Sequence, residues 1–190
     1  MSLLMLKDLP RYECLLECAK RFPDLNPGAS EVFMLMLQVA DQLHSVKTDF
    51  LGRHGLSNGR FTVLMLLSTV GLQTCEDDAG NQRKGLTPAE LAEMAGVTRA
   101  TMSGLIDTLE KDGLVRREAD PSDRRMMRVL LTARSDRFLD QVLPGYFRRV
   151  AAIMDPLASS DRQTLKTLLL KVQVGMAAAG QVDRARAAVV

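Results

Sequence analysis

The fold of this chain is decided by residues 86–132, which read LTPAELAEMAGVTRATMSGLIDTLEKDGLVRREADPSDRRMMRVLLT. Within this stretch, Thr87 can cap a helix and Glu90, three residues later, can complete a capping box. Gly96 can end that helix after two turns, and Thr98 offers the cap of a second helix. The sequence therefore predicts two short helices joined by a tight turn that contains a glycine, which is a helix-turn-helix.

The periodicity changes after Gly113. Residues 114–118 and 128–132 predict two strands, and residues 119–123 between them read ADPSD, which is turn chemistry. A β-hairpin that follows a helix-turn-helix directly is a wing.

Helical periodicity predicts the rest of the chain. A long helix is expected over 30–53, with Ser30 as its cap. Its apolar residues form a heptad-like seam at spacings of three and four: Val32, Met36, Val39, Leu43, Val46 and Phe50. A second apolar row on this helix indicates two packing partners, one of which we interpret as a second subunit. Further helices are expected over 9–22, 56–71, 135–153 (with a kink at Pro144) and 160–180, before an end that frays.

The amino-acid composition limits the classes of function that this chain can have. The 190 residues are 46% hydrophobic and 25% charged, which is typical of one soluble globular domain. No apolar run is long enough for a membrane span, and the first residues lack a secretory signal, so we expect a cytoplasmic protein without a membrane partner. The 25 basic and 23 acidic residues leave a net charge of +2, so a DNA-binding surface must concentrate its charge locally. Three cysteines and two histidines favour neither a disulfide framework nor a metal site, and no cofactor is expected.

Three segments together resemble the MarR-type winged helix-turn-helix regulators: LTPAELAEMAGVT at 86–98, GLIDTLEKDGLVRR at 104–117 and DPSDRR at 120–125, with VLLT at 129–132. The resemblance covers roughly residues 30–178. It implies a mainly α fold with a small β-wing, in which a winged helix-turn-helix lobe joins an interlocking helical dimerisation lobe. The implied organisation is an N-terminal extension with a short helix at 1–29, a winged-helix domain at 30–180 and a tail at 181–190. Within that domain, the winged helix spans about 56–132 and the dimerisation helices span about 30–54 and 135–179.

The resemblance also implies a function. Such proteins are homodimeric, sequence-specific transcription regulators, and we expect a repressor that binds a pseudo-palindromic double-stranded operator. Release by a small aromatic or anionic effector is expected. The loop at 73–85 and the extension before Ser30 are longer than in the common pattern.

The recognition helix is expected over Thr98–Lys111. Its first turn and outward face expose the candidate DNA-binding residues Thr98, Arg99, Ala100, Thr101 and Ser103. Arg99 is the best candidate for a guanine contact, because its guanidinium matches the two guanine acceptors. Without the wing, these residues would describe an ordinary solvent-exposed helix face.

The wing, Arg116–Arg128, carries five arginines against three carboxylates, and arginine suits the narrow minor groove of A·T-rich DNA. By resemblance, Arg124 or Arg125 enters that groove, and we expect Arg125 to pair with Asp107 and so to fix the angle of the wing. The competing interpretation is an exposed charged hairpin whose ion pairs contribute little.

Other candidates are less specific. His44, Phe61, Met65 and Tyr146 are candidates to line an effector pocket. Cys14 and Cys18 share a helix face, and an N-terminal cysteine resembles the oxidant-sensing branch of the family, although idle thiols are the commoner case. Cys75 is expected in an exposed loop.

One other class of function stays open: a winged helix that binds proteins and has no specific DNA site, which the low net charge permits. We do not expect an enzyme, because the sequence contains no phosphate-binding glycine loop, nucleophile elbow or cluster of catalytic carboxylates.

Overall fold

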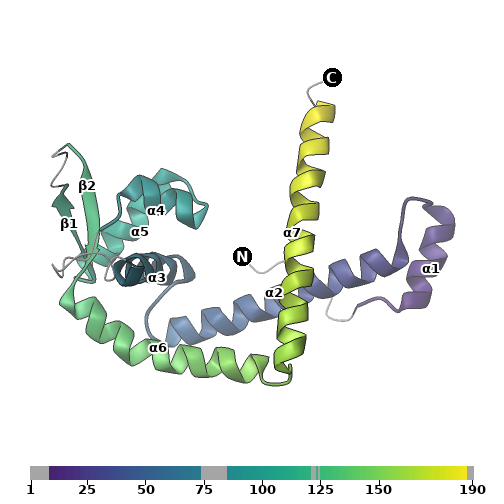
Figure 1. The fold of residues 1–190 in the computed structure, drawn as a ribbon, viewed down its shortest axis with the longest axis horizontal. Helices are drawn as coiled ribbons and strands as arrows, with labels where there is room; N and C mark the ends of the chain where they lie inside the picture. The colour runs from purple at the N-terminus through teal and green to yellow at the C-terminus, as the bar shows by residue number, and fades with distance from the viewer. Residues whose placement is uncertain (1–8, 74–84, 121–122, 124, 188–190) are drawn as a thin grey trace. The chain divides into compact units, whose positions relative to one another are not determined.

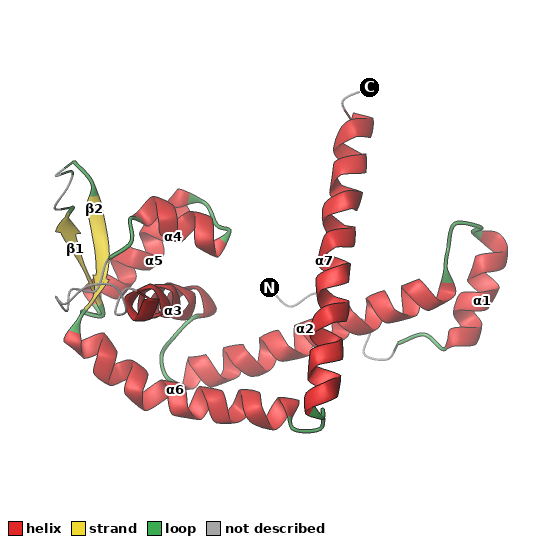
Figure 2. Cartoon of the chain, in the orientation of Figure 1, coloured by secondary structure: helices red, strands yellow, loops and turns green. Residues whose placement is uncertain are grey.

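The computed structural model describes residues 9–73, 85–120, 123 and 125–187. The chain divides into two compact units, Met1–Leu139 and Asp140–Val190. Figures 1 and 2 show a mostly helical chain with one small two-stranded sheet, as the sequence predicts. The elements are α1 (Tyr12–Arg21), α2 (Pro27–Arg53), α3 (Asn58–Gln73), α4 (Pro88–Ala95), α5 (Arg99–Lys111), β1 (Val115–Ala119), β2 (Met127–Leu131), α6 (Ala133–Met154) and α7 (Ser159–Ala187).

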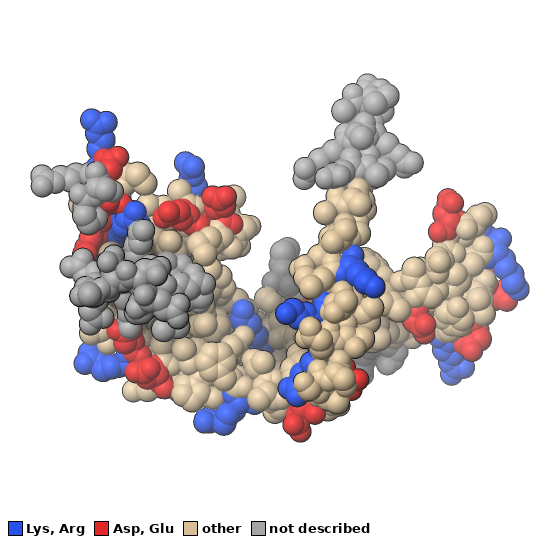
Figure 3. Space-filling view, in the orientation of Figure 1, with Lys and Arg blue, Asp and Glu red and all other residues tan. Residues whose placement is uncertain are grey.

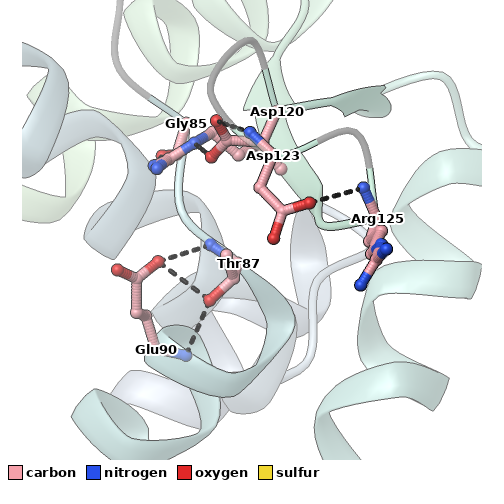
Figure 4. Close-up of polar contacts among 7 residues, drawn as sticks. Gly85, Thr87, Glu90, Asp120, Asp123 and Arg125 are labelled. Atoms are coloured by element: carbon pink, nitrogen blue, oxygen red, sulfur yellow. Dashed lines mark hydrogen bonds and ion pairs between the residues drawn. The ribbon is translucent and has the colours of Figure 1, made fainter.

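The helix-turn-helix forms as predicted, and its caps explain why. The Thr87 hydroxyl accepts from the Glu90 N–H at 3.2 Å, while the Glu90 carboxylate accepts from the Thr87 N–H at 2.7 Å. Figure 4 shows this reciprocal capping box. Gly96 ends α4 in the left-handed region with φ 64°, where glycine carries no steric penalty, and Thr98 caps α5.

Several predicted helix ends are wrong. α2 starts at Pro27 instead of Ser30, because the Asn26 side chain accepts from the Ala29 N–H at 3.0 Å and caps the helix earlier. α3 continues past Gly71 to Gln73. α7 starts at Ser159, one residue earlier than predicted, and continues beyond 180 to Ala187.

The wing is an antiparallel pair, with Val115 opposite Leu131 and Ala119 opposite Met127. The segment before α4 adds a short bridge, in which the Leu86 N–H donates to the Val129 carbonyl at 3.1 Å. Gly85 makes this approach possible, because a Cβ there would lie 2.7 Å from the Val129 carbonyl oxygen. The chain before the helix-turn-helix is thereby tied to the wing.

The core of the first unit lies where α3, α4, α5 and the sheet meet. Its fully buried side chains include Leu64, Leu91, Met102, Ile106 and Val129. α1 packs against α2 through Leu15, its one buried side chain. None of the described helices is both long and apolar enough to cross a lipid bilayer.

The second unit contains the rest of α6 and α7. α6 runs through Pro144 as one helix. The end of α6 and the first turns of α7 form an open groove of about 350 Å³, whose apolar lining includes Met154, Leu165, Leu169 and Leu170.

Candidate nucleic-acid interface

α5 presents one face to the core and another to solvent. Met102, Ile106 and Leu109, which follow each other at spacings of four and three, have no exposed surface. The predicted DNA-contacting positions are all exposed: Thr98, Arg99, Ala100, Thr101 and Ser103. The burial of one face therefore fixes which side of α5 is free to meet a partner.

At the start of α5, two threonines form the helix cap, whereas Arg99 does not take part in it. The Thr98 hydroxyl accepts from the Thr101 N–H at 3.1 Å and lies 2.9 Å from the Thr101 hydroxyl. These two threonines are thus engaged in the cap. Among the described residues, Arg99 has no ion-pair partner, so its guanidinium is available.

Arg117 fixes the wing against α5. Its guanidinium donates to Asp107 and to Glu110, and its backbone N–H donates to Glu110 at 3.3 Å. The pair with Asp107 is the main cause that raises the pKa of Arg117. The predicted pair of Asp107 with Arg125 is therefore wrong in this structure, because Arg117 on the adjoining strand occupies Asp107.

Arg60 holds the other end of α5, a contact that the sequence analysis missed. Its guanidinium, on the first turn of α3, pairs with Asp112 just after α5 and donates to the Gly55 carbonyl at 3.1 Å. Only 16% of the Arg60 side chain is exposed. Two arginines from different elements thus brace α5, at its flank and at its C-terminal end.

Among the described wing arginines, three form ion pairs within the protein. Besides Arg117, Arg116 pairs with Glu118 at 2.5 Å, and Arg128 pairs with the buried Asp120 and donates to the Gly85 carbonyl at 2.7 Å. Glu118 and Asp120 are already among the three wing carboxylates, but Arg117 is paired with carboxylates of α5, so the wing offers less positive charge to DNA than its own sequence indicates. The contacts of Arg117 with α5 and of Arg128 with the Gly85 carbonyl also anchor the hairpin to the rest of the winged helix.

Arg125 lies at the tip of the wing. Arg125 is exposed, and its backbone N–H donates to the Asp123 side chain at 3.0 Å, as Figure 4 shows. Arg124, the other predicted minor-groove residue, lies outside the described residues. On the face visible in Figure 3, basic and acidic side chains lie close together around α4.

The four predicted effector-pocket residues lie on three helices. Phe61 is buried on α3, with the Lys47 ammonium of α2 5.5 Å from its ring centroid. Met65 is half-buried on α3, and His44 is exposed on α2. Tyr146 lies on α6 in the second unit, and the assignment of these four residues to one pocket stays a prediction.

Cys14 and Cys18 are both exposed free thiols on α1. Cys75 lies outside the described residues. Among the residues that are described, no group of three or more histidine, cysteine or acidic side chains is placed to hold a metal ion.

Comparison with known proteins agrees with this geometry. Residues 81–127 match the MarR family. The HTH-type transcriptional repressor YetL of Bacillus subtilis is 32% identical over 164 residues, which span 86% of this chain and 92% of YetL. YkoM, an uncharacterised HTH-type regulator of the same organism, is 27% identical over 69% of this chain and 75% of its own.

The structure of Sco3205, a MarR family regulator from Streptomyces coelicolor in complex with DNA, is similar with a TM-score of 0.64 and 28% identity. That similarity covers 77% of this chain and 88% of Sco3205.

The fold and the exposed, braced helix define a DNA-binding winged helix-turn-helix protein. The chain belongs to the MarR family of transcription regulators. Its relatives are regulators and not enzymes, as the sequence analysis predicted.

Proposed function

We propose that the protein is a homodimeric, sequence-specific transcriptional repressor. The observation that carries this proposal is α5 itself: a helix braced by Arg60 and Arg117 that leaves Arg99 exposed and without an ion pair among the described residues. A rigid helix with a free guanidinium in its first turn suits direct reading of guanine in the major groove.

The exposed seam of α2 supports a dimer. Val32, Val39, Leu43 and Val46 are between 37% and 55% exposed. On α7, Leu168, Leu170, Val174 and Met176 are more than half exposed. Exposed apolar side chains in this number favour a protein interface, and a second copy of the chain offers the same surfaces for a symmetric contact.

A symmetric dimer would present two α5 helices to half-sites about one helical turn apart. Arg125 at each wing tip would then reach the flanking minor groove, which suits A·T-rich sequence. Repression, rather than activation, is supported by the resemblance to the repressor YetL.

Release by a small effector is the finer part of the proposal. α2 meets α3 through the Lys47–Phe61 contact and through Asn58, whose side-chain N–H donates to the Thr48 hydroxyl at 2.6 Å. An anionic aromatic compound that pairs with Lys47 would loosen this contact and shift the winged helix relative to α2. His44 and Met65 lie on the same two helices.

Sedimentation and DNA titration test the proposal together. The free protein should sediment as a dimer, and its affinity for an operator should fall steeply as salt rises, because phosphate contacts release counterions. A monomer would contradict the dimer. Equal, weak binding to every DNA sequence would instead favour a protein-interaction module.

A further inference from the structure

The face of α1 that carries Cys14 and Cys18 has no part in the proposed DNA interface. The two residues lie four apart in a continuous helix, so their Cβ atoms are neighbours at about 5–6 Å. α1 packs against α2 with Leu15 buried, and both thiols lie on the exposed part of the helix. Two free thiols therefore lie side by side on one face of α1.

The neighbouring side chains leave these sulfurs accessible. Glu17, the acidic residue between them, forms an ion pair with Lys20 at 2.6 Å. The Arg21 guanidinium lies over the Phe22 ring, 5.4 Å from its centroid. Glu17, Lys20 and Arg21 therefore make contacts that do not involve the two thiols.

We infer that Cys14 and Cys18 form a chelating dithiol site for soft, thiophilic acceptors that take two sulfur ligands, such as trivalent organoarsenicals. Sulfur ligands select soft acceptors over hard ones. A structural zinc ion takes four protein ligands, whereas this face supplies two, so an acceptor with two open positions matches it better.

The chemistry balances without an oxidant. With phenylarsine oxide, each thiol sulfur forms one bond to arsenic, and the arsenic–oxygen bonds break. The oxygen leaves as water with the two thiol protons, and no atom changes oxidation state. Because both bonds close on one helix face, the bridge should resist exchange with single thiols, which must displace both sulfurs.

Intact-mass measurement on the reduced full-length protein tests this inference. One equivalent of phenylarsine oxide is added, followed by excess 2-mercaptoethanol or, separately, a dithiol. The wild type and Cys75→Ser should each keep one phenylarsenic group against the monothiol and lose it to the dithiol. Cys14→Ser and Cys18→Ser should lose the phenylarsenic group to the monothiol as well as to the dithiol.

A displaced pair controls for geometry. The double variant Cys18→Ser, Leu16→Cys keeps the number of thiols but puts the second one two residues from Cys14, on another face of the helix. Leu16 is 44% exposed, so the fold should tolerate the exchange. Loss of monothiol resistance in this variant is expected. If this double variant or Cys14→Ser keeps the phenylarsenic group against the monothiol, the assignment is overturned. Loss of the group from Cys75→Ser under the same conditions would overturn it too.

Discussion

Arg117 on β1 donates to Asp107 on α5, and this pair joins the wing to the exposed helix. Arg116, the preceding residue, pairs with Glu118 of its own strand. Successive side chains of a strand point to opposite faces, so one arginine braces the interface and its neighbour does not. The two residues form a matched pair for experiment.

Arg117→Ala should weaken operator binding by about 3- to 10-fold, which corresponds to about 0.7–1.4 kcal/mol. The free energy of unfolding should fall by about 1 kcal/mol or less, because the pair is partly exposed. Fluorescence anisotropy and urea unfolding measure the two quantities. Arg116→Ala removes the same charge and is the control: if it weakens DNA binding as much, charge and not positioning explains the effect.

Arg99→Ala should relax base preference at one position of each half-site, with a loss of about 1–3 kcal/mol of discrimination. Affinities for operators with single base substitutions measure this. Lys111→Ala removes one positive charge from the other end of α5 and should leave the preference profile intact. An unchanged profile for Arg99→Ala would contradict its assignment to base reading.

The α4 capping box should make stability depend on pH in the acidic range. Backbone and hydroxyl hydrogen bonds from Thr87 lower the pKa of Glu90 below its ordinary value of 4.5. A depressed carboxyl pKa contributes stability that is present above the ordinary value and is lost as pH falls through the folded-state value. Thr87→Ala should therefore cost about 1 kcal/mol near pH 7, and less at about pH 3. Denaturant unfolding at both pH values checks this, and an equal cost at each would refute it.

Two glycine substitutions should change the stability of the fold in opposite directions. An added Cβ at Gly104, within α5, meets no atom within 4 Å, so Gly104→Ala should stabilise the fold by about 0.5–1 kcal/mol. Gly85→Ala should destabilise by about 1–3 kcal/mol, because its Cβ would meet the Val129 carbonyl and the Leu130 side chain at 2.7 and 2.8 Å. Thermal unfolding distinguishes the two signs.

Local capping chemistry explains why so much of the winged helix was predictable. Thr87, Glu90, Gly96 and Thr98 each act over a few residues, and the structure confirms each assignment. The start of α2 was missed because Asn26 caps before the apolar seam begins. Here too the signal is local, since asparagine followed by proline is a good helix start.

The partners of the charged side chains were harder to predict. The choice between Arg117 and Arg125 for Asp107 depends on how β1 lies against α5, which the sequence pattern of either element alone does not give. Strand alternation offered a clue, because Val115 is buried and Arg117 shares its side of the strand. The Arg60–Asp112 pair joins residues 52 apart and had no local signal.

Selection from random double-stranded DNA by the purified wild-type protein tests the central claim most directly. A symmetric dimer with two reading helices predicts enrichment of a pseudo-palindrome whose half-sites are centred about 10 base pairs apart, with A·T-rich flanks that weaken in Arg125→Ala. Enrichment of a single half-site without symmetry, or of no sequence at all, would contradict the account.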